Sequence, residues 1–244
     1  MRALLAAELL SVWEQGRARP SVEQALTLIA AACPETSPEA LARLSIGQRD
    51  SRLLTLREWM FGPKLAGLAV CPACGQRLEM TFDVSDIRLG IETEPAETLS
   101  LTVAGYEVRF RLPNSLDLAA VGGSEGIAVT RQLLFERCLL AAHCDGEERS
   151  AEQLPANVVA AVVERMAQVD PQADAQLALS CPSCRHQWQE IFDIASFFWS
   201  EISVWSSRIL REVHALASAY RWREADILAM SPWRRQFYLE MVGR

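Results

Sequence analysis

Four of the seven cysteines fall in two Cys-x-x-Cys pairs, Cys71 with Cys74 and Cys181 with Cys184. Two cysteines at this spacing lie on one side of a tight turn, so both sulfurs can reach one metal ion at about 2.3 Å. Two such turns supply four thiolates, which complete the tetrahedral shell of a zinc ion and leave no position for water. We therefore expect one structural Zn2+ bound by Cys71, Cys74, Cys181 and Cys184, with no Lewis-acid role.

The sequence after each cysteine pair is also repeated. The shared positions are Leu78 and Trp188, Phe82 and Phe192, Asp83 and Asp193, and Val84 and Ile194. Each half therefore has the pattern of one knuckle and one strand of a zinc ribbon. We expect a discontinuous zinc ribbon made of residues 63–88 and 174–194, with residues 89–173 inserted between its halves.

Other chemistry for these cysteines stays open at this point. An iron–sulfur cluster uses the same four thiolates, and a redox dithiol uses a single Cys-x-x-Cys pair. A thiol redox enzyme needs an exposed cysteine of low pKa in a thioredoxin-like βαβ setting, which the sequence predicts around neither pair. Four reduced core cysteines explain the turn-forming Cys-Pro contexts poorly, and His186 could replace one sulfur.

The remaining cysteines and histidines form no second site in the sequence. Cys33, Cys138 and Cys144 lie on or beside apolar helical patterns, where a free thiol behaves as a small hydrophobic side chain. His143 has no second histidine nearby, and His214 falls inside a long helical pattern. The sequence shows no phosphate-binding loop, dinucleotide-binding turn, zinc-protease motif or nucleophile elbow. We predict a protein that is not an enzyme and has no small-molecule substrate.

Helical segments flank the expected ribbon. Residues 1–62 have apolar residues at spacings of three and four, with helix starts at Ser21 and Ser37 and a stop at Gly62-Pro63. Residues 195–244 are helical again, with one long helix over about 196–220 whose apolar side chains form a single stripe. We expect an α+β, helix-rich fold in which this stripe packs on the protein's own core or on a partner.

The middle of the chain changes to a period of two. Residues 78–84 alternate between apolar and polar, which predicts a strand. Residues 101–112 alternate around a turn at Ala104-Gly105, which predicts a hairpin, whereas residues 127–142 and 156–169 have helical spacing. We expect the insertion to be a β-hairpin and at least two helices, because a structureless segment of that length is rare in a compact domain.

Composition restricts the class of protein. The chain has 244 residues, of which 50% are hydrophobic and 23% are charged, so it can bury a core. The formal net charge of −7 argues against a surface devoted to nucleic acid. Glu8 interrupts the first apolar run before a signal-peptide core is complete, and no apolar run approaches the roughly 18 residues of a membrane span. We therefore expect a cytoplasmic protein that is not bound to membranes.

Several blocks of sequence carry a resemblance to a known family. They are Ile46-Gly-Gln-Arg-Asp50 with Phe61-Gly-Pro63, Arg111-Leu-Pro113-Asn-Ser-Leu-Asp117, Tyr220-Arg-Trp222, and Ile227-Leu228 with Ser231-Pro-Trp-Arg-Arg235. Together with the two cysteine pairs, they resemble the baseplate and hub-assembly proteins of contractile-tailed phages and of related bacterial contractile injection systems. The resemblance runs nearly end to end.

This resemblance implies a non-enzymatic role at a baseplate hub, as a structural component or as an assembly chaperone. The partners would be other hub, spike or tape-measure proteins, and no catalytic residue is carried over. The residues themselves suggest where a partner docks, because aromatic and arginine side chains near the C-terminus exceed what one helical stripe can bury. The side chains expected to meet a partner are Trp199, Trp222, Trp233, Arg234 and Tyr238. The alternative is that they fold back on the N-terminal helices.

A nucleic-acid-binding zinc ribbon is the competing hypothesis. The arginines and tryptophans between Arg221 and Arg235 combine basic and stacking groups, as proteins that bind single strands do. Against this hypothesis, Ser231-Pro232 has the pattern of a helix cap, Trp233 could pack inward, and the overall charge is negative. Salt-dependent retention on heparin or DNA separates the two hypotheses.

Overall fold

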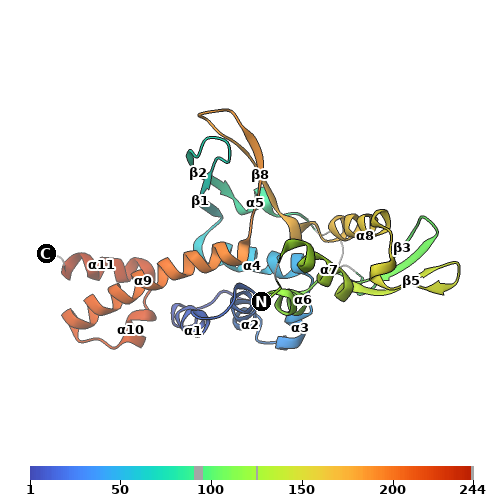
Figure 1. Ribbon diagram of the computed structural model, residues 1–244. Helices are drawn as coiled ribbons and strands as arrows, with labels where there is room; N and C mark the ends of the chain where they lie inside the picture. Colours follow the sequence, from blue (N-terminus) through green and yellow to red (C-terminus); the bar gives the residue numbers. More distant parts are fainter. Residues whose placement is uncertain (91–95, 125, 243–244) are drawn as a thin grey trace. The chain divides into compact units, whose positions relative to one another are not determined.

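The computed structural model describes residues 1–90, 96–124 and 126–242, and their contacts divide into two compact units. One unit consists of Met1–Thr36 with Ile194–Arg244, and the other of Ser37–Asp193. The fold is α+β and rich in helices, as the sequence predicts (Figure 1). The finer segment boundaries expected from the sequence, after residues 62, 88, 173 and 194, stay a proposal.

The first unit is helical. Its helices are α1 (Ala6–Gly16), α2 (Ser21–Ala32), α9 (Ile194–Tyr220), α10 (Glu224–Leu228) and α11 (Pro232–Val242). The other four helices all contact α9. The apolar stripe of α9 is buried, with Phe198, Ile202 and Ile209 almost inaccessible to water. The stripe therefore packs on the protein's own core, which confirms the first of the two alternatives.

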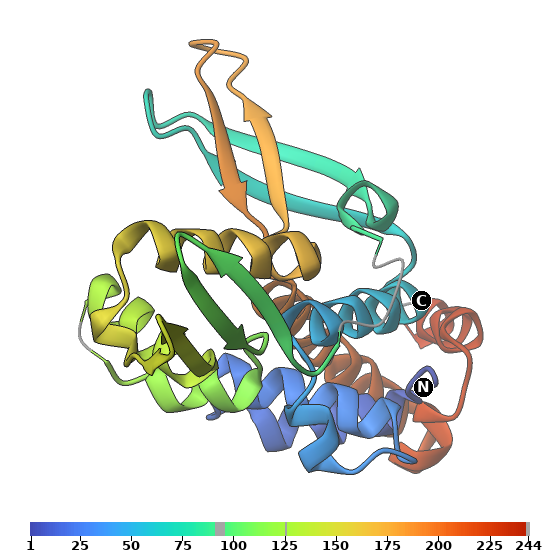
Figure 2. The ribbon, with the colours of Figure 1, turned by 90° about the vertical axis from the view of Figure 1, so that its right-hand side faces the viewer.

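The second unit begins with two helices, α3 (Pro38–Ala42) and α4 (Ile46–Phe61). Ser45 caps α4 by accepting a hydrogen bond from the Gln48 N–H at 3.2 Å, and Gly62 ends it with a positive φ of 88°. Two antiparallel hairpins then lie side by side (Figure 1 and Figure 2). They are β1 (Lys64–Val70) with β2 (Arg77–Asp83), and β7 (Gln176–Ser180) with β8 (Gln187–Ile191).

A four-stranded antiparallel sheet of order β3-β4-β5-β6 forms the centre of the insertion. The strands are β3 (Leu99–Val103), β4 (Tyr106–Phe110), β5 (Leu139–Cys144) and β6 (Glu147–Glu148). The expected β3–β4 hairpin turns at Ala104-Gly105, where both residues have positive φ. Helix α8 (Ala156–Val169) forms one core with the sheet, in which Val158 and Val162 join Val108 and Phe110. The other elements are α5 (Val84–Ile87), α6 (Ser115–Val121), α7 (Ile127–Cys138), η1 (Ala151–Gln153) and η2 (Pro171–Asp174).

Two expectations about local structure are corrected. Helix α7 ends at Cys138, and residues 139–142, expected to be helical, belong to strand β5 and pair with β4. A short apolar run is compatible with a buried helix and with a buried strand, and here pairing with β4 makes it a strand. Val84, expected to end a strand, instead begins α5, because Asp83 and Asp86 form a capping box there.

Candidate metal centre and docking surface

The two cysteine pairs lie at the tips of the two hairpins, and the tips share one geometry. In each tip the N–H of the first cysteine donates to a carbonyl five residues on, and its own carbonyl accepts from an N–H four residues on, all at 2.9 Å. The residues at that fourth position, Gly75 and Arg185, have positive φ values of 73° and 63°. The sequence repeat is therefore a structural repeat with a constant offset of 110 residues. Each half is a complete hairpin, whereas the sequence predicted one strand per half.

The hairpins bring all four predicted ligands together. The Sγ atoms of Cys71 and Cys184 lie 3.7 Å apart, and those of Cys74 and Cys181 lie 3.6 Å apart. All four sulfurs lie within 4.8 Å of one another. Sulfurs bound at about 2.3 Å to one tetrahedral ion stand about 3.8 Å apart, so the arrangement can hold a single metal ion.

Hydrogen bonds separate the pKa values of these thiols. The N–H groups of Cys184 and Ser183 help to lower the pKa of Cys181 to about 7. The N–H of Gln76 acts in the same direction on Cys74, but hydrogen bonds with the neighbouring thiols, Cys184 first, outweigh it and raise the pKa of Cys74 to about 12. Four thiols this close cannot all ionise without an opposing charge, and a divalent cation supplies that charge.

An aromatic contact joins the two hairpins. Phe82 and Phe192, which occupy equivalent positions in the repeat, meet edge to face with ring centroids 5.6 Å apart. Leu78 and Trp188, the other equivalent pair, are only partly buried, and Trp188 stacks on His186. A two-stranded hairpin is marginally stable in water, so a metal bound at the tips would supply much of the cohesion of this ribbon.

The Ile46–Asp50 block contacts the end of the insertion, just before the chain enters the second hairpin of the ribbon. The Gly47 N–H donates to Asp170 Oδ2 at 2.9 Å, and a Cβ at Gly47 would collide with the same carboxylate. Burial raises the pKa of Asp170 although this hydrogen bond opposes the shift. Two residues on, Gln172 donates to the Ile87 carbonyl at 3.2 Å and accepts from the Leu89 N–H at 2.8 Å. These residues join α4 and η2 to the segment after the first hairpin.

The same block is joined to the Arg111–Asp117 block. The Ile46 N–H donates to the Pro113 carbonyl at 3.1 Å, and Arg49 donates to Ser115 Oγ at 3.5 Å. Arg49 also forms an ion pair with Asp50 at 2.7 Å, and burial raises the pKa of Asp50 despite that pairing. Two of the blocks that carry the family resemblance therefore meet in the interior of the second unit.

Asp117 is the centre of a buried ion-pair network in that block. It accepts hydrogen bonds from Arg111 at 2.8 Å and from Arg137 at 3.0 Å, and its side chain is 1% exposed. Burial opposes ionisation, but the hydrogen bonds from Arg111 and the Asn114 N–H outweigh burial, so the pKa of Asp117 lies below its usual range. These charged groups satisfy one another and stabilise the fold.

Three of the five side chains expected to meet a partner are packed within the first unit. Trp199 covers Gly16, where no room remains for a side chain. Trp222 contacts both Tyr220 and Tyr238, with ring centroids 4.5 and 4.8 Å away. These rings join the core formed by α1, α9 and α10, as the folding-back alternative anticipates.

The other two side chains, Trp233 and Arg234, are exposed on α11. Trp233 is 77% exposed, and Phe237 and Met241 follow it at steps of four residues with 49% and 46% exposure. The rings of Trp233 and Phe237 stack with centroids 5.8 Å apart. We call Trp233, Phe237 and Met241 the α11 stripe. Phe237 and Met241 were not among the side chains expected to meet a partner, although their spacing of four residues from Trp233 is typical of one helix face.

Hydropathy of the helices bears on membrane insertion. Among residues 1–90, 96–124 and 126–242, no helix combines the length and the apolar character that crossing a bilayer requires.

Comparison with known protein families gives a match. A family model described as T4 bacteriophage base plate protein matches residues 3–199. The matched range includes both cysteine hairpins and both interior blocks, and it ends within α9, before α10 and α11. No curated protein and no solved structure matches the chain.

Proposed function

The chain belongs to the T4 bacteriophage base plate protein family, and from this premise we propose that it is a non-enzymatic structural component of the baseplate hub, in a contractile phage tail or a contractile injection system. Family membership makes it a baseplate protein that interacts with other baseplate proteins. The observation that carries the finer proposal is the four-cysteine cluster, which joins two hairpins from distant parts of the sequence. A closed thiolate shell serves structure and leaves no position for a substrate.

Zinc is the ion that we propose for this cluster. Sulfur–sulfur distances of 3.6 and 3.7 Å suit one tetrahedral ion, whereas cysteines around a multi-iron cluster stand farther apart. Each Cys-x-x-Cys pair forms the hydrogen-bonded knuckle of its own hairpin, and neither pair sits at the start of a helix as a redox dithiol does. The ion fixes the ribbon and takes no part in a reaction.

Docking is the activity that we propose for the C-terminal surface. Trp233 and Arg234 lie on the exposed side of α11, and Trp199, Trp222 and Tyr238 support the same unit from within. Interface centres are rich in tryptophan, tyrosine and arginine. The partners proposed are other hub, spike or tape-measure proteins.

The packing of the aromatic residues favours docking over binding of nucleic acid. Tyr220 stacks on Trp222, Tyr238 meets the Trp222 ring at an interplanar angle of 81°, and Arg235 is buried in an ion pair with Glu212. A single-strand binding surface needs free ring faces and free cations. Binding to heparin that weakens steeply with salt would favour the competing hypothesis.

The test is complementation of a strain that lacks the chain, followed by analysis of purified particles. We expect wild-type particles to contain the chain, and the purified chain to carry one zinc. Cys181→Ser should lose the zinc and fail to assemble, whereas Cys144→Ser, a cysteine outside the cluster, should behave as wild type. A chain required for assembly but absent from finished particles would be a chaperone, and normal assembly without the chain would contradict the proposed role.

A further inference from the structure

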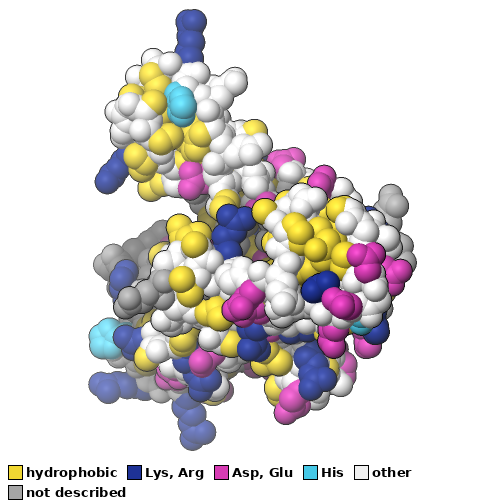
Figure 3. Space-filling model, turned by 45° about the vertical axis from the view of Figure 1, so that its right-hand side comes forward, with side chains coloured by type: hydrophobic (Ala, Val, Ile, Leu, Met, Phe, Trp, Pro, Cys, Tyr) yellow, Lys and Arg dark blue, Asp and Glu magenta, His cyan; other side chains and the backbone are white. Residues whose placement is uncertain are grey.

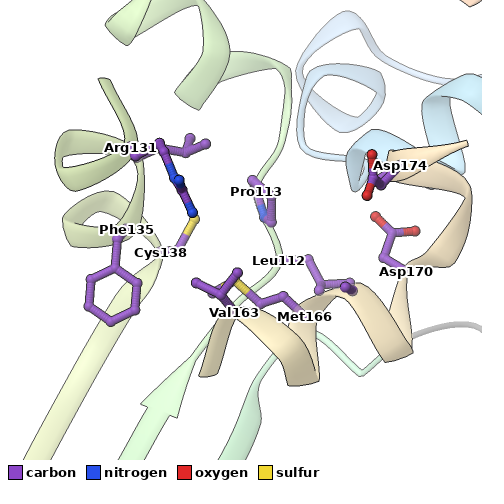
Figure 4. A pocket seen from close by; sticks show the side chains of 12 residues that line it. Leu112, Pro113, Arg131, Phe135, Cys138, Val163, Met166, Asp170 and Asp174 are labelled. Carbon is purple, nitrogen blue, oxygen red and sulfur yellow. The ribbon is translucent and has the colours of Figure 1, made fainter. Parts of the chain in front are cut away.

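A groove with apolar walls lies between α7 and α8 in the second unit. It consists of a hollow of about 270 Å3 and a wider one of about 820 Å3, and both are lined by Arg131 and Val163. Figure 4 shows Phe135 and Cys138 of α7 on one wall and Val163 and Met166 of α8 on another. The apolar side chains that define this α7–α8 groove are Leu112, Phe135, Leu154, Val159, Val163 and Met166.

The charged side chains that line the groove are acidic except for Arg131, and together they form its acidic rim. Glu152 and Glu164 border the wider hollow, and Asp174 borders the smaller one. On the face shown in Figure 3, hydrophobic side chains gather in a patch that acidic side chains border. Residues 127–174, which form the groove and its surroundings, contain eight acidic and four basic residues. The groove therefore attracts an apolar segment that carries positive charge.

The α11 stripe has the complementary character. Residues 207–242, which include α11, contain six arginines against four acidic residues, although the whole chain is acidic. From Trp233 to Met241 the stripe is about 12 Å long, and the part of α8 that lines the groove, from Ala156 to Ala167, is about 17 Å long. An amphipathic helix of this length can lie in such a groove with its large side chains in the hollows.

We infer that the α11 stripe of one copy docks into the α7–α8 groove of a second copy of this chain. The inference rests on the proposed function only because it takes α11 as a docking surface. It identifies a second copy of this chain as a partner at that surface. Among the described residues, both halves of the contact present exposed apolar side chains, such as Trp233 on α11 and Val163 on α8, and the segments that carry them have opposite net charge.

The contact is heterologous, because each copy gives a helix to one neighbour and a groove to another. Such contacts build a closed ring or an open chain of copies. Three partly exposed side chains bury less area than the roughly 1,200 Å2 of a stable interface, so the association depends on protein concentration. In a baseplate, neighbouring subunits would raise the local concentration.

Sedimentation velocity of the zinc-loaded full chain, over a range of concentrations, tests the inference. Wild type should show a mass that grows with concentration. The double variant Trp233→Ala with Phe237→Ala removes the two aromatic side chains of the stripe, and Glu164→Arg reverses one charge of the acidic rim beside the wider hollow, so each should stay monomeric. Mixed together they should form a dimer and nothing larger, because the mixture holds one intact stripe and one intact groove. Val204→Ala, which removes an exposed apolar side chain from α9, is the matched control and should associate as wild type.

Three outcomes would overturn the inference. Wild type could remain monomeric at every concentration, which would also be the result if each chain filled its own groove. Either variant could associate with itself as strongly as wild type does. The mixed variants could fail to form a dimer while circular dichroism and zinc content show both to be folded. None of these outcomes touches particle incorporation, so the inference can fail while the proposed function stands.

Discussion

The ribbon and the sheet of the insertion are both β structure in the second unit, but different interactions hold them together. The ribbon consists of two separate two-stranded hairpins whose shared interior is largely half-buried, and its four cysteines meet at the tips. The insertion has four paired strands, with Val108, Phe110 and Ala142 buried against Val158 and Val162. On the proposed zinc site, the ribbon would depend on four sulfur atoms, whereas the sheet distributes its stability over an apolar core.

The comparison shows that the stability of a sheet depends on how many strands it has and on whether a helix covers one of its faces. A two-stranded hairpin has one face at most to bury, whereas a larger sheet with a helix on one face can exclude water. Metal coordination replaces an apolar core where the polypeptide supplies too little of it. Changes to the ribbon should therefore act through the metal, and changes to the sheet should act through packing.

Removal of the proposed zinc should have the largest effect. Chelation should cost several kcal/mol of stability, because the binding free energy of a structural ion is folding free energy. Hydrogen exchange should show loss of protection in β1, β2, β7 and β8, with β4 and β5 still protected. Chelator-treated protein with fully protected ribbon amides would remove the distinction between the two regions.

Phe110→Ala should give the opposite pattern. Phe110 is fully buried in the core of the insertion, so its truncation should lower the free energy of unfolding by about 3–5 kcal/mol. Denaturant unfolding measures that loss, and metal analysis should still find one zinc per chain. Leu116→Ala, at an exposed leucine of α6, is the control and should change stability little. Loss of zinc in Phe110→Ala would mean that the two regions fold as one.

Asp117→Asn should cost about 2 kcal/mol, because it leaves Arg111 and Arg137 without their buried partner. The pKa of Asp117 is lowered in the folded protein, so its contribution is present above the pKa of the unfolded chain and is lost as pH falls through the folded value. The stability difference between Asp117→Asn and wild type should therefore shrink in acid. A difference that does not depend on pH would contradict the ion-pair explanation.

Leu78→Ala should have the smallest effect. Leu78 is partly exposed in the ribbon, so truncation should cost only about 1 kcal/mol while the metal is bound. Thermal unfolding of the zinc-loaded protein measures this cost. A loss as large as that of Phe110→Ala would show that apolar packing, rather than the metal, holds the hairpins together.

The four-cysteine cluster was predictable from the sequence because its signal is local and repeated. Each Cys-x-x-Cys pair predicts a knuckle. Phe82 and Phe192 follow the two pairs at the same distance, so the two halves of the ribbon can be aligned from the sequence alone. The helices at both ends were also visible from spacing and caps. Strand β5 could not be predicted in this way, because its apolar residues become a strand only through pairing with β4.

Contacts between distant residues were beyond sequence reasoning. Gly47 belongs to a recognisable block, but the reason for a glycine there is the carboxylate of Asp170, more than a hundred residues away. The α11 stripe was found only in part, because exposure of Phe237 depends on which side of α11 packs on α9. Periodicity identifies a helix face, but tertiary packing decides which face is exposed.

The offset of 110 residues between the two hairpins also sets an order of events during synthesis. At roughly 5–20 residues per second, the second cysteine pair leaves the ribosome roughly 5–20 s after the first. During that delay the first knuckle can offer the proposed zinc only two of its four sulfur ligands. The sheet of the insertion can form in the same interval from contacts within its own segment. Zinc binding by all four sulfurs would thus come late, and it would mark a chain translated at least as far as Cys184.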